Sequence, residues 1–452
     1  MKKLTLGTIL AALASFLSAQ TLALRVGHLV DPETGTVRDN QLIVIQDGVF
    51  TAIGANAAIP AGAEVIDLSQ YYVSPGLVDA HNHLALTQKL VPEGDQYYLT
   101  TVLDSSVSRG IQAVSNGFSM LASGFTMERD LGNNGNYADT ALRTAIEQGW
   151  VPGPTIINSG LIIGGFGGQL NPVPEREMLI YPEYLNADTN DEIVKAVHRN
   201  ILFGARVIKI CVDCKSYGYT VDEIKLFIKE AARAGLKVAG HCGTRAGVMR
   251  AIQAGIWSVE HCGGCDDETH RLMAEKGIWR VGTEFPLIDY DTMTVFDRIN
   301  PKSERAQARY KRQEQSLKSA YANHVKMGFS SDADYYIPGK TRGQVVIDFL
   351  KSWKDAEIPA AQILKIMTVN GYQICDISDR RGPIKTGLPA DLIAIRGNPL
   401  QDIDTLKDVR FVIKDGMVFK RDGVVLAENF FHGGPVYGGR GGRGGRGGRG
   451  SN

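Results

Sequence analysis

Apolar and polar positions follow a repeating pattern through the middle of the chain. From about residue 190, a segment with helical apolar spacing is followed by a glycine and then by a short β-branched run. We expect helices over 191–203, 220–235, 245–254, 267–276 and 304–327, and strands over 206–212, 236–241, 256–261, 278–284 and 329–332. Repeated units of this length favour a parallel sheet with right-handed crossovers. We therefore predict a (β/α)8 TIM-like barrel over residues 73–382, with a doubly wound sheet as the alternative.

The segments on either side of this region have a different pattern. Residues 22–72 and 385–425 alternate apolar and polar positions and are broken by turn signals such as Asp415-Gly416. The ends of a compact unit often lie close together. We predict that residues 20–72 and 383–430 form one composite β-sandwich domain.

The first 19 residues differ from both patterns. Lys2 and Lys3 precede an apolar run from Leu4 to Leu17, and Ser18-Ala19 follows it. A basic start, a short apolar run and small residues are typical of a secretory signal peptide, although a buried N-terminal helix is the alternative. The run is shorter than the roughly 20 residues that span a membrane, and no later stretch is long enough. We predict a signal peptide over 1–19 and export to the periplasm or the exterior.

The last 20 residues, 433–452, repeat Gly-Gly-Arg and are predicted to be a disordered tail. This tail resembles Arg/Gly-rich RNA-binding segments. The whole chain has 49 basic and 49 acidic residues. Since all charges in the signal and tail segments are basic, the body between them is acidic. An acidic body argues against nucleic-acid binding, and we expect a small-molecule partner instead.

Candidate metal ligands follow several of the expected strands. His81-Asn82-His83 comes directly after the apolar segment 71–80, and residues two apart in a strand point to the same face. The C-terminal rim of a barrel is where catalytic residues collect. Four further residues lie at or near such strand ends: Lys209, His241, His261 and Asp332. Together these positions predict a metal-dependent active site.

Lys209 is unusual because it lies inside the apolar strand segment 207–211. A buried lysine tends to lose its proton, and a neutral amine reacts with CO2 to form a carbamate that can bridge two cations. The alternative is a lysine whose ammonium group extends to the rim. In the company of the histidines and Asp332, we favour the carbamate.

These motifs resemble the metal-dependent amidohydrolase superfamily over nearly the whole chain. The resemblance is carried by Pro75–His83, Ile208–Ile210, Val238–His241, Ser258–His261, Ser330–Ala333 and Gly387–Leu392. More narrowly, Arg129–Gly132 and Pro152–Pro154 resemble the branch of Xaa-Pro dipeptidase, imidazolonepropionase-like and ochratoxinase-like hydrolases.

The resemblance implies two divalent metal ions, which we expect to be zinc. It assigns His81, His83 and Asp332 to the first ion, His241 and His261 to the second, and carboxylated Lys209 to the bridge between them. It also makes Asp332 the group that takes a proton from the attacking water and returns it to the leaving amine. We expect the enzyme to be a homo-oligomer.

Substrate residues are assigned less directly. In this branch a nearby tyrosine contacts the substrate carbonyl, and Tyr217 is our candidate for this catalytic contact. Phe166 stands where relatives often have a histidine, which suggests an apolar or aromatic acyl group. Arg245 follows His241 closely and would receive a substrate carboxylate. Tyr217 and Arg245 also have purely structural alternatives.

We therefore predict a binuclear amidohydrolase that cleaves a dipeptide or an N-acyl amino acid. The alternative is an imidazolonepropionase-like hydrolase of a cyclic amide, or a deaminase with one metal. Elemental analysis separates these alternatives, because the relatives with cyclic or deaminated substrates usually use one metal.

The cysteines allow a further hypothesis. Cys211-x-x-Cys214 and Cys262-x-x-Cys265 have the spacing of a split four-cysteine zinc site, but the 47-residue gap between them is long for a compact site. A disulfide is the other alternative. The sequence does not choose its partners among Cys211, Cys214, Cys242, Cys262 and Cys265.

Overall fold

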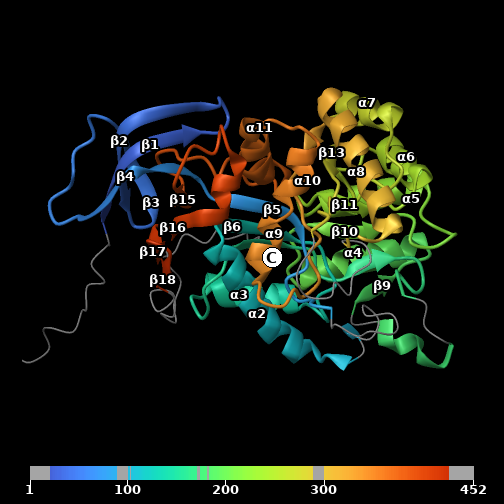
Figure 1. Ribbon diagram of the computed structural model, residues 1–452. Coiled ribbons are helices and arrows are strands. Elements are labelled where there is room, and N and C mark those ends of the chain that lie inside the picture. The colour runs from blue at the N-terminus through green and yellow to red at the C-terminus, as the bar shows by residue number, and fades with distance from the viewer. Residues whose placement is uncertain are drawn as a thin grey trace, which may run out of the picture.

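A computed structural model describes residues 21–426 except 89–99, 102, 171–173, 181–182 and 289–299. The predicted signal peptide and the Gly/Arg tail lie outside the described residues. Within the described part of the chain, no helix is long and apolar enough to cross a membrane. Strands from both chain ends lie together on one side of the molecule, and the parallel strands and their helices occupy the other (Figure 1).

The first sheet joins the two chain ends. It is an eight-stranded mixed sheet in the order β18-β17-β16-β15-β4-β1-β2-β3. Its strands are β1 (Leu22–Asp31), β2 (Thr36–Gln46), β3 (Val49–Gly54), β4 (Glu64–Pro75), β15 (Leu392–Ile395), β16 (Val409–Lys414), β17 (Met417–Arg421) and β18 (Val424–Val425). β4 is the junction, because it pairs in parallel with β1 and antiparallel with β15. The N- and C-terminal segments therefore share one sheet.

The parallel strands form two further sheets, one of three strands in the order β5-β6-β7 and one of seven in the order β14-β13-β12-β11-β10-β8-β9. Their bounds are β5 (Leu77–Asn82), β6 (Phe125–Asp130), β7 (Thr155–Asn158), β8 (Ile162–Gly164), β9 (Tyr184–Asn186), β10 (Ile208–Cys211), β11 (Val238–His241), β12 (Ser258–Glu260), β13 (Trp279–Val281) and β14 (Lys326–Met327). Backbone hydrogen bonds of residues just after β14 and just before β10 also connect the two sheets. The amide of Ala80 donates to the carbonyl of Phe329, and the amide of Arg206 donates to the carbonyl of Asn158.

Helices separate these strands along the chain. Their bounds are α2 (Ser106–Ala122), α3 (Ala138–Glu147), α4 (Asn190–Leu202), α5 (Val221–Ala232), α6 (Arg245–Ala254), α7 (Asp267–Lys276), α8 (Glu304–Ala322), α9 (Arg342–Ile347), α10 (Leu350–Asp355), α11 (Ala360–Lys365) and α12 (Gly371–Ile374). A capping box begins α5, since the Thr220 side chain accepts from the amide of Glu223 and the Glu223 side chain accepts from the amide of Thr220. Gly255 and Gly277 end α6 and α7 in the left-handed conformation.

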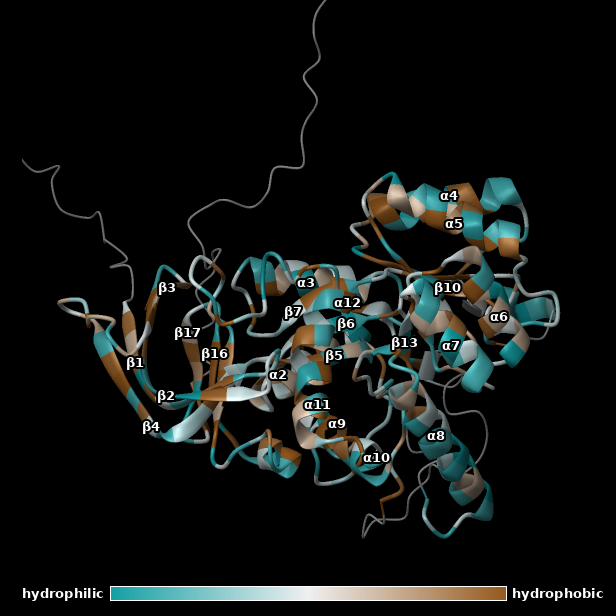
Figure 2. Cartoon of the chain, turned by 90° about the horizontal axis from the view of Figure 1, so that it is seen from above, coloured by the Kyte–Doolittle hydropathy of each residue, from teal (hydrophilic) through white to brown (hydrophobic). Residues whose placement is uncertain are grey.

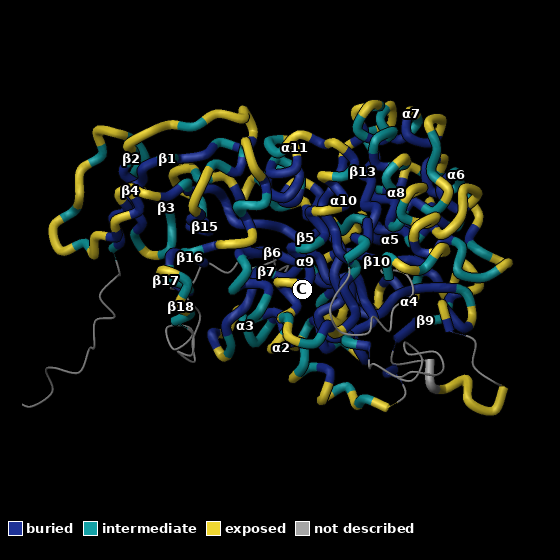
Figure 3. The backbone as a smooth tube through the Cα atoms, viewed as in Figure 1, coloured by how far each residue is buried: buried dark blue, intermediate teal, exposed yellow. Residues whose placement is uncertain are grey.

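Burial follows the layers of the fold. The strands β5, β6 and β10 are buried throughout, whereas the surrounding helices have exposed outer residues (Figure 3). Hydrophobic and hydrophilic residues accordingly mix along helices such as α4 and α5 (Figure 2). Charged side chains inside the buried strands therefore stand out.

The predicted boundaries of the helix and the strand that precede Asp332 are wrong. The helix expected over 304–327 ends at Ala322, and the strand is Lys326–Met327 instead of 329–332. His324 has a φ of 56°, which a helix does not allow, and the next residue, Val325, is buried. The helix therefore stops early so that the chain can enter the sheet.

Candidate metal centre and its cavity

A cavity of about 1130 Å³ opens where β10, β11 and β12 end. Lys209, His241, His261 and Asp332 line it, together with His83. Charged and aromatic side chains extend the wall toward α8, including Phe285, Arg309 and Arg312. Residues from distant parts of the sequence thus meet at one end of the parallel strands.

His81, His83 and Asp332 form a cluster at the base of this cavity. Their ligand atoms all lie within 4.8 Å of one another. The Nε2 atom of His83 is 2.9 Å from Oδ1 of Asp332, and Nε2 of His81 is 3.7 Å from the same oxygen. Two imidazoles and a carboxylate in this arrangement are suited to a divalent metal ion.

The outer nitrogens of both imidazoles are held by buried acceptors. Nδ1 of His81 is 2.9 Å from Oε2 of Glu260, and Nδ1 of His83 is 2.7 Å from the carbonyl oxygen of Gly132. When Nδ1 donates these bonds, Nε2 of each ring is left as the nitrogen that faces the cluster. Burial, followed by the nearby Lys209 charge, holds the pKa of His81 well below its ordinary value. A neutral imidazole is the form that binds metal.

Asp332 is ionised in this setting. Burial alone would raise the pKa of its carboxyl group, but the hydrogen bond with His83 holds that pKa well below its ordinary range. The Asp332 amide also donates to the carbonyl of His81 at 2.8 Å. This backbone hydrogen bond therefore holds the Asp332 carboxylate next to His83.

Lys209 is buried, with 2% of the residue exposed. Its Nζ lies 3.3 Å from Nε2 of His81. Burial lowers the pKa of this amine to about 8, although Glu260 and Asp332 oppose the shift. A substantial fraction of the amine is consequently neutral near pH 8.

His241 and His261 stand beside this group. Their ring centroids are 4.4 Å apart, and the His261 ring is 4.9 Å from that of His81. Nδ1 of His261 is 3.0 Å from Oγ1 of Thr283 and 3.8 Å from Oδ2 of Asp332. Burial lowers the pKa of His241 to about 4. The six residues singled out in the sequence as ligands thus occupy one continuous region.

A buried charged network that the sequence pattern did not predict supports this region. The Arg129 guanidinium donates to Glu260, to the Ser258 hydroxyl and to the carbonyl of Ala80. Glu260 in turn holds His81. Arg129 and Glu260 lie in β6 and β12, which are buried along their whole length. Charged residues inside strand segments of the predicted barrel region were the signal available in the sequence.

A second buried carboxylate connects β5 to the segment that carries Asp332. Asp79 accepts from the amides of His81 and Ser331, at 3.0 and 3.1 Å, and from the Ser331 hydroxyl. Burial raises the pKa of Asp79 to about 7. His261 and Asp332 both have positive φ, 64° and 50°. Such strained backbone is common at functional sites.

The three candidate substrate residues lie elsewhere. None of them lines the cavity, whose described wall contains neither Phe166, Tyr217 nor Arg245. The Tyr217 hydroxyl donates to the backbone oxygen of Phe166 at 2.9 Å, and both side chains are exposed. Arg245 forms ion pairs with Asp266 and Glu268.

The structure resolves the question of cysteine pairing for the described chain. Cys211 and Cys214 form a disulfide, whereas Cys242, Cys262, Cys265 and Cys375 are free thiols. The hypothesis of a four-cysteine zinc site is therefore wrong for this state of the protein, because two of its sulfurs are bonded to each other.

Comparison with known proteins assigns the family. The profile described as "Amidohydrolase family" matches residues 72–419, which include the whole cluster at the base of the cavity. The chain belongs to this family and is a hydrolase that acts on amide bonds. The resemblance seen in the motifs is thereby confirmed.

Individual relatives agree with this assignment. The chain is 27% identical to the ochratoxinase of Aspergillus niger over 448 residues, which cover 91% of this chain and 89% of that protein. It is similar to the crystal structure of a Xaa-Pro dipeptidase with bound methionine in the active site, with a TM-score of 0.75, 27% identity, and coverage of 89% and 100% of the two chains. The crystal structure of A. niger ochratoxinase has a TM-score of 0.71 at 24% identity, covers 93% and 98% of the two chains, and shows the shared fold.

Proposed function

We propose that this protein is a binuclear metal-dependent amidohydrolase that cleaves the amide bond of a dipeptide or an N-acyl amino acid. The observation that carries the proposal is the cluster of His81, His83 and Asp332 within 4.8 Å, beside the buried amine of Lys209. The family assignment supports the hydrolytic reaction.

The donor set fits two divalent cations. His81, His83 and Asp332 would hold one, His241 and His261 the other, and Lys209 as a carbamate would bridge them. The fit rests on the low pKa of the buried Lys209 amine, which favours reaction with CO2, and on the Nδ1 partners that leave Nε2 of His81 and His83 facing the cluster. When bound, the two cations supply acidification of a water molecule and polarisation of the scissile carbonyl.

Asp332 moves the proton in this proposal. Its carboxylate lies beside His83, and its low pKa keeps it ionised, which is the form that can accept a proton from the attacking water. The same carboxyl group then delivers the proton to the leaving amine nitrogen. The hydrogen bond from the Asp332 amide to the carbonyl of His81 fixes the backbone at this position, so the carboxylate does not need to reorient first.

The outer wall of the cavity supports a substrate with a carboxylate and an apolar group. Arg309 and Arg312 project from α8 on the cavity wall, and the Arg309 guanidinium lies 5.2 Å from the centre of the Phe285 ring. Guanidinium groups bind carboxylates through paired hydrogen bonds. We assign the substrate carboxylate to Arg309 and Arg312, which line the cavity, in place of Arg245, which pairs with Asp266 and Glu268 outside that lining.

The test combines metal content with a substrate panel. We expect about two zinc ions per chain and cleavage of at least one member of a panel of N-acyl amino acids and dipeptides, including Xaa-Pro. Asp332→Asn should lower turnover about 100-fold or more. Full activity of that variant would exclude the assigned base. A single metal with cleavage of cyclic amides only would favour the imidazolonepropionase-like alternative.

The same proposal extends to the fold and the location of the enzyme. We propose that the two parallel sheets close into one (β/α)8 barrel, supported by the bonds from Ala80 to Phe329 and from Arg206 to Asn158. We also propose that the protein is exported and forms a homo-oligomer. The Cys211–Cys214 disulfide supports export, since such bonds persist in oxidising compartments. Cell fractionation and light scattering test these two points.

A further inference from the structure

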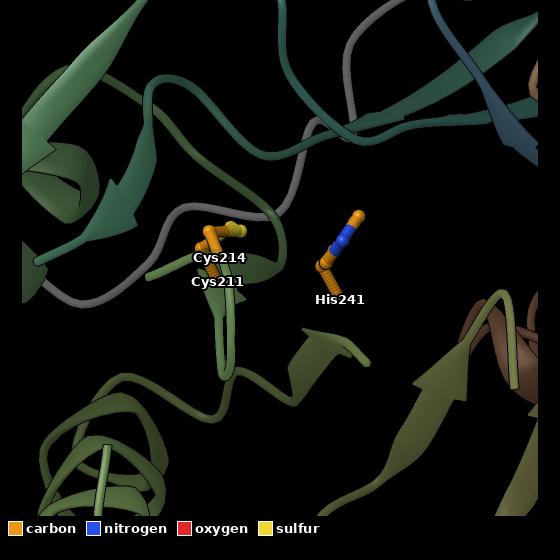
Figure 4. A group of neighbouring side chains, drawn as sticks. All are labelled: Cys211, Cys214 and His241. Atoms are coloured by element: carbon orange, nitrogen blue, oxygen red, sulfur yellow. A yellow bond between two sulfur atoms is a disulfide. The ribbon is translucent and has the colours of Figure 1, made fainter. Parts of the chain in front are cut away.

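A disulfide and an imidazole lie together at the edge of the cavity. Cys211 ends β10, Cys214 follows three residues later, and His241 ends the neighbouring strand β11 (Figure 4). The two sulfur atoms and a nitrogen of His241 lie within 4.8 Å of one another. Two thiolates and one imidazole are a donor set that thiophilic cations such as Zn²⁺ and Cd²⁺ prefer. In the disulfide the sulfurs do not serve as such ligands.

Bonds other than the disulfide hold this arrangement. Asp213, between the two cysteines, accepts from the amides of Gly243 and Thr244 at 2.8 and 2.7 Å, and from the Thr244 hydroxyl. The amide of Val212 donates to the carbonyl of His241 at 3.0 Å. The loop with the cysteines is thus fastened to the segment that begins at His241. Breaking the sulfur–sulfur bond leaves these contacts in place.

The surroundings of Cys211 and Cys214 would allow this cysteine pair to be reduced and reoxidised. Cys211 is buried against Ile162, Leu170 and Tyr184, whereas Cys214 is only half-buried. Cys211 and His241 both line the cavity, so small reagents can approach from there. The Lys215 amine donates to the carbonyl of Leu170 at 2.6 Å and holds the far side of the loop.

We propose that reduction of the Cys211–Cys214 disulfide creates a binding site for a thiophilic divalent cation, formed by both thiolates and His241. A dithiol reductant supplies two electrons and two protons, becomes a disulfide itself, and leaves two thiols on the protein. Binding of the cation releases the two thiol protons. A second consequence rests on the proposed function: the occupied site withdraws His241 from the hydrolytic centre, so the disulfide keeps that histidine available for hydrolysis.

Cadmium titration of the full chain tests the site directly. Metal-free protein is divided, and one half is reduced with a phosphine and freed of excess reagent. We expect the reduced half to bind about one more Cd²⁺ ion per chain than the oxidised half, with additional thiolate-to-cadmium absorption in the ultraviolet. Since Cys262 and Cys265 are free in both halves, they contribute equally to both. Equal absorption in the two halves would overturn the proposal.

Two ligand variants and one control variant locate the extra ion. Cys214→Ser should abolish the difference between reduced and oxidised protein, whereas Cys375→Ser, which removes a buried free thiol, should keep it. His241→Gln should weaken the extra Cd²⁺ binding while leaving the same two thiols. An unchanged difference in Cys214→Ser or unchanged affinity in His241→Gln would contradict the assigned ligands.

Activity measurements separate this proposal from the proposed function. One equivalent of Cd²⁺ should abolish most hydrolysis by the reduced zinc enzyme but not by the oxidised one, and reoxidation after chelation should restore it. If no substrate is cleaved, the cadmium absorption still tests the site. If hydrolysis is normal but the absorption difference is missing, only the cysteine site is rejected. Full hydrolysis with the extra ion bound would reject the withdrawal of His241.

Discussion

The base of the cavity and its outer edge differ in how their polar side chains are held. At the base, His81 is 0% exposed and Lys209 is 2% exposed, and each contacts buried partners on other strands. Around the edge, outside the lining of the cavity, Phe166 is 42% and Tyr217 is 57% exposed, and Arg245 pairs with acidic neighbours on the surface. Positions at the base are held by contacts between buried strands, whereas Phe166 and Tyr217 lie in turns and Arg245 begins α6 at the surface.

The largest effect is expected at the base, from Lys209→Ala. Loss of the bridging group should reduce metal content and lower turnover about 1000-fold, equivalent to about 4 kcal/mol of lost transition-state stabilisation. A short carboxylic acid should restore part of the activity. Metal analysis and kinetics measure both effects.

The matched control is Lys237→Ala, which removes the same side chain at the start of β11, where the amine lies 3.7 Å from Asp376. This variant should keep its metal and its turnover. Wild-type metal content and rate in Lys209→Ala would reject the carbamate. They would also show that the buried base of the cavity is no more important for activity than its edge.

A smaller effect is expected from Glu260→Gln, because Glu260 contacts the proposed ligand His81 and is not itself a proposed metal ligand. The change keeps the shape of the side chain but removes the charge that faces Arg129 and Nδ1 of His81. Metal affinity should fall about 10- to 100-fold. Competition with a chelator measures it. Glu268→Gln, an exposed partner of Arg245, serves as the control, and equal affinities in the two variants would show that Glu260 does not position His81.

The residues at the base of the cavity could largely be predicted from the sequence, whereas the contacts that support them and those at the edge could not. Strand ends could be predicted because short apolar runs and glycine stops set the spacing that carries Lys209, His241 and His261 to one rim. The supporting role of Glu260 could not be predicted, because its partner Arg129 is 131 residues away in the sequence. Likewise, the spacing after His241 did not reveal that Arg245 turns toward α7 instead of the cavity. Such pairings depend on tertiary contacts that a local pattern does not encode.

At the edge, the arginines of α8 provide a sharper test. Arg312→Ala should raise KM about tenfold for substrates with a carboxylate, since one charge-assisted contact is lost, with little change in kcat. Arg245→Ala should leave KM unchanged. The reverse result, with KM raised only in Arg245→Ala, would return the substrate carboxylate to the residue first indicated by the sequence.

The smallest effect concerns stability at the edge. The hydrogen bond from Arg245, followed by that from the Thr269 amide, lowers the pKa of Asp266 to about 2 from the ordinary value of 3.8. A carboxyl group whose pKa is lower in the folded protein stabilises the fold above its unfolded pKa, and that contribution is lost as the pH falls through the folded pKa. Wild type should therefore melt slightly higher than Arg245→Ala at pH values above 3.8, and the difference in Tm should shrink as the pH falls from 3.8 toward about 2. Because both partners are largely exposed, the difference should also shrink in high salt. A Tm difference that is independent of pH and salt would mean that Arg245 acts through packing of its side chain and not through its charge.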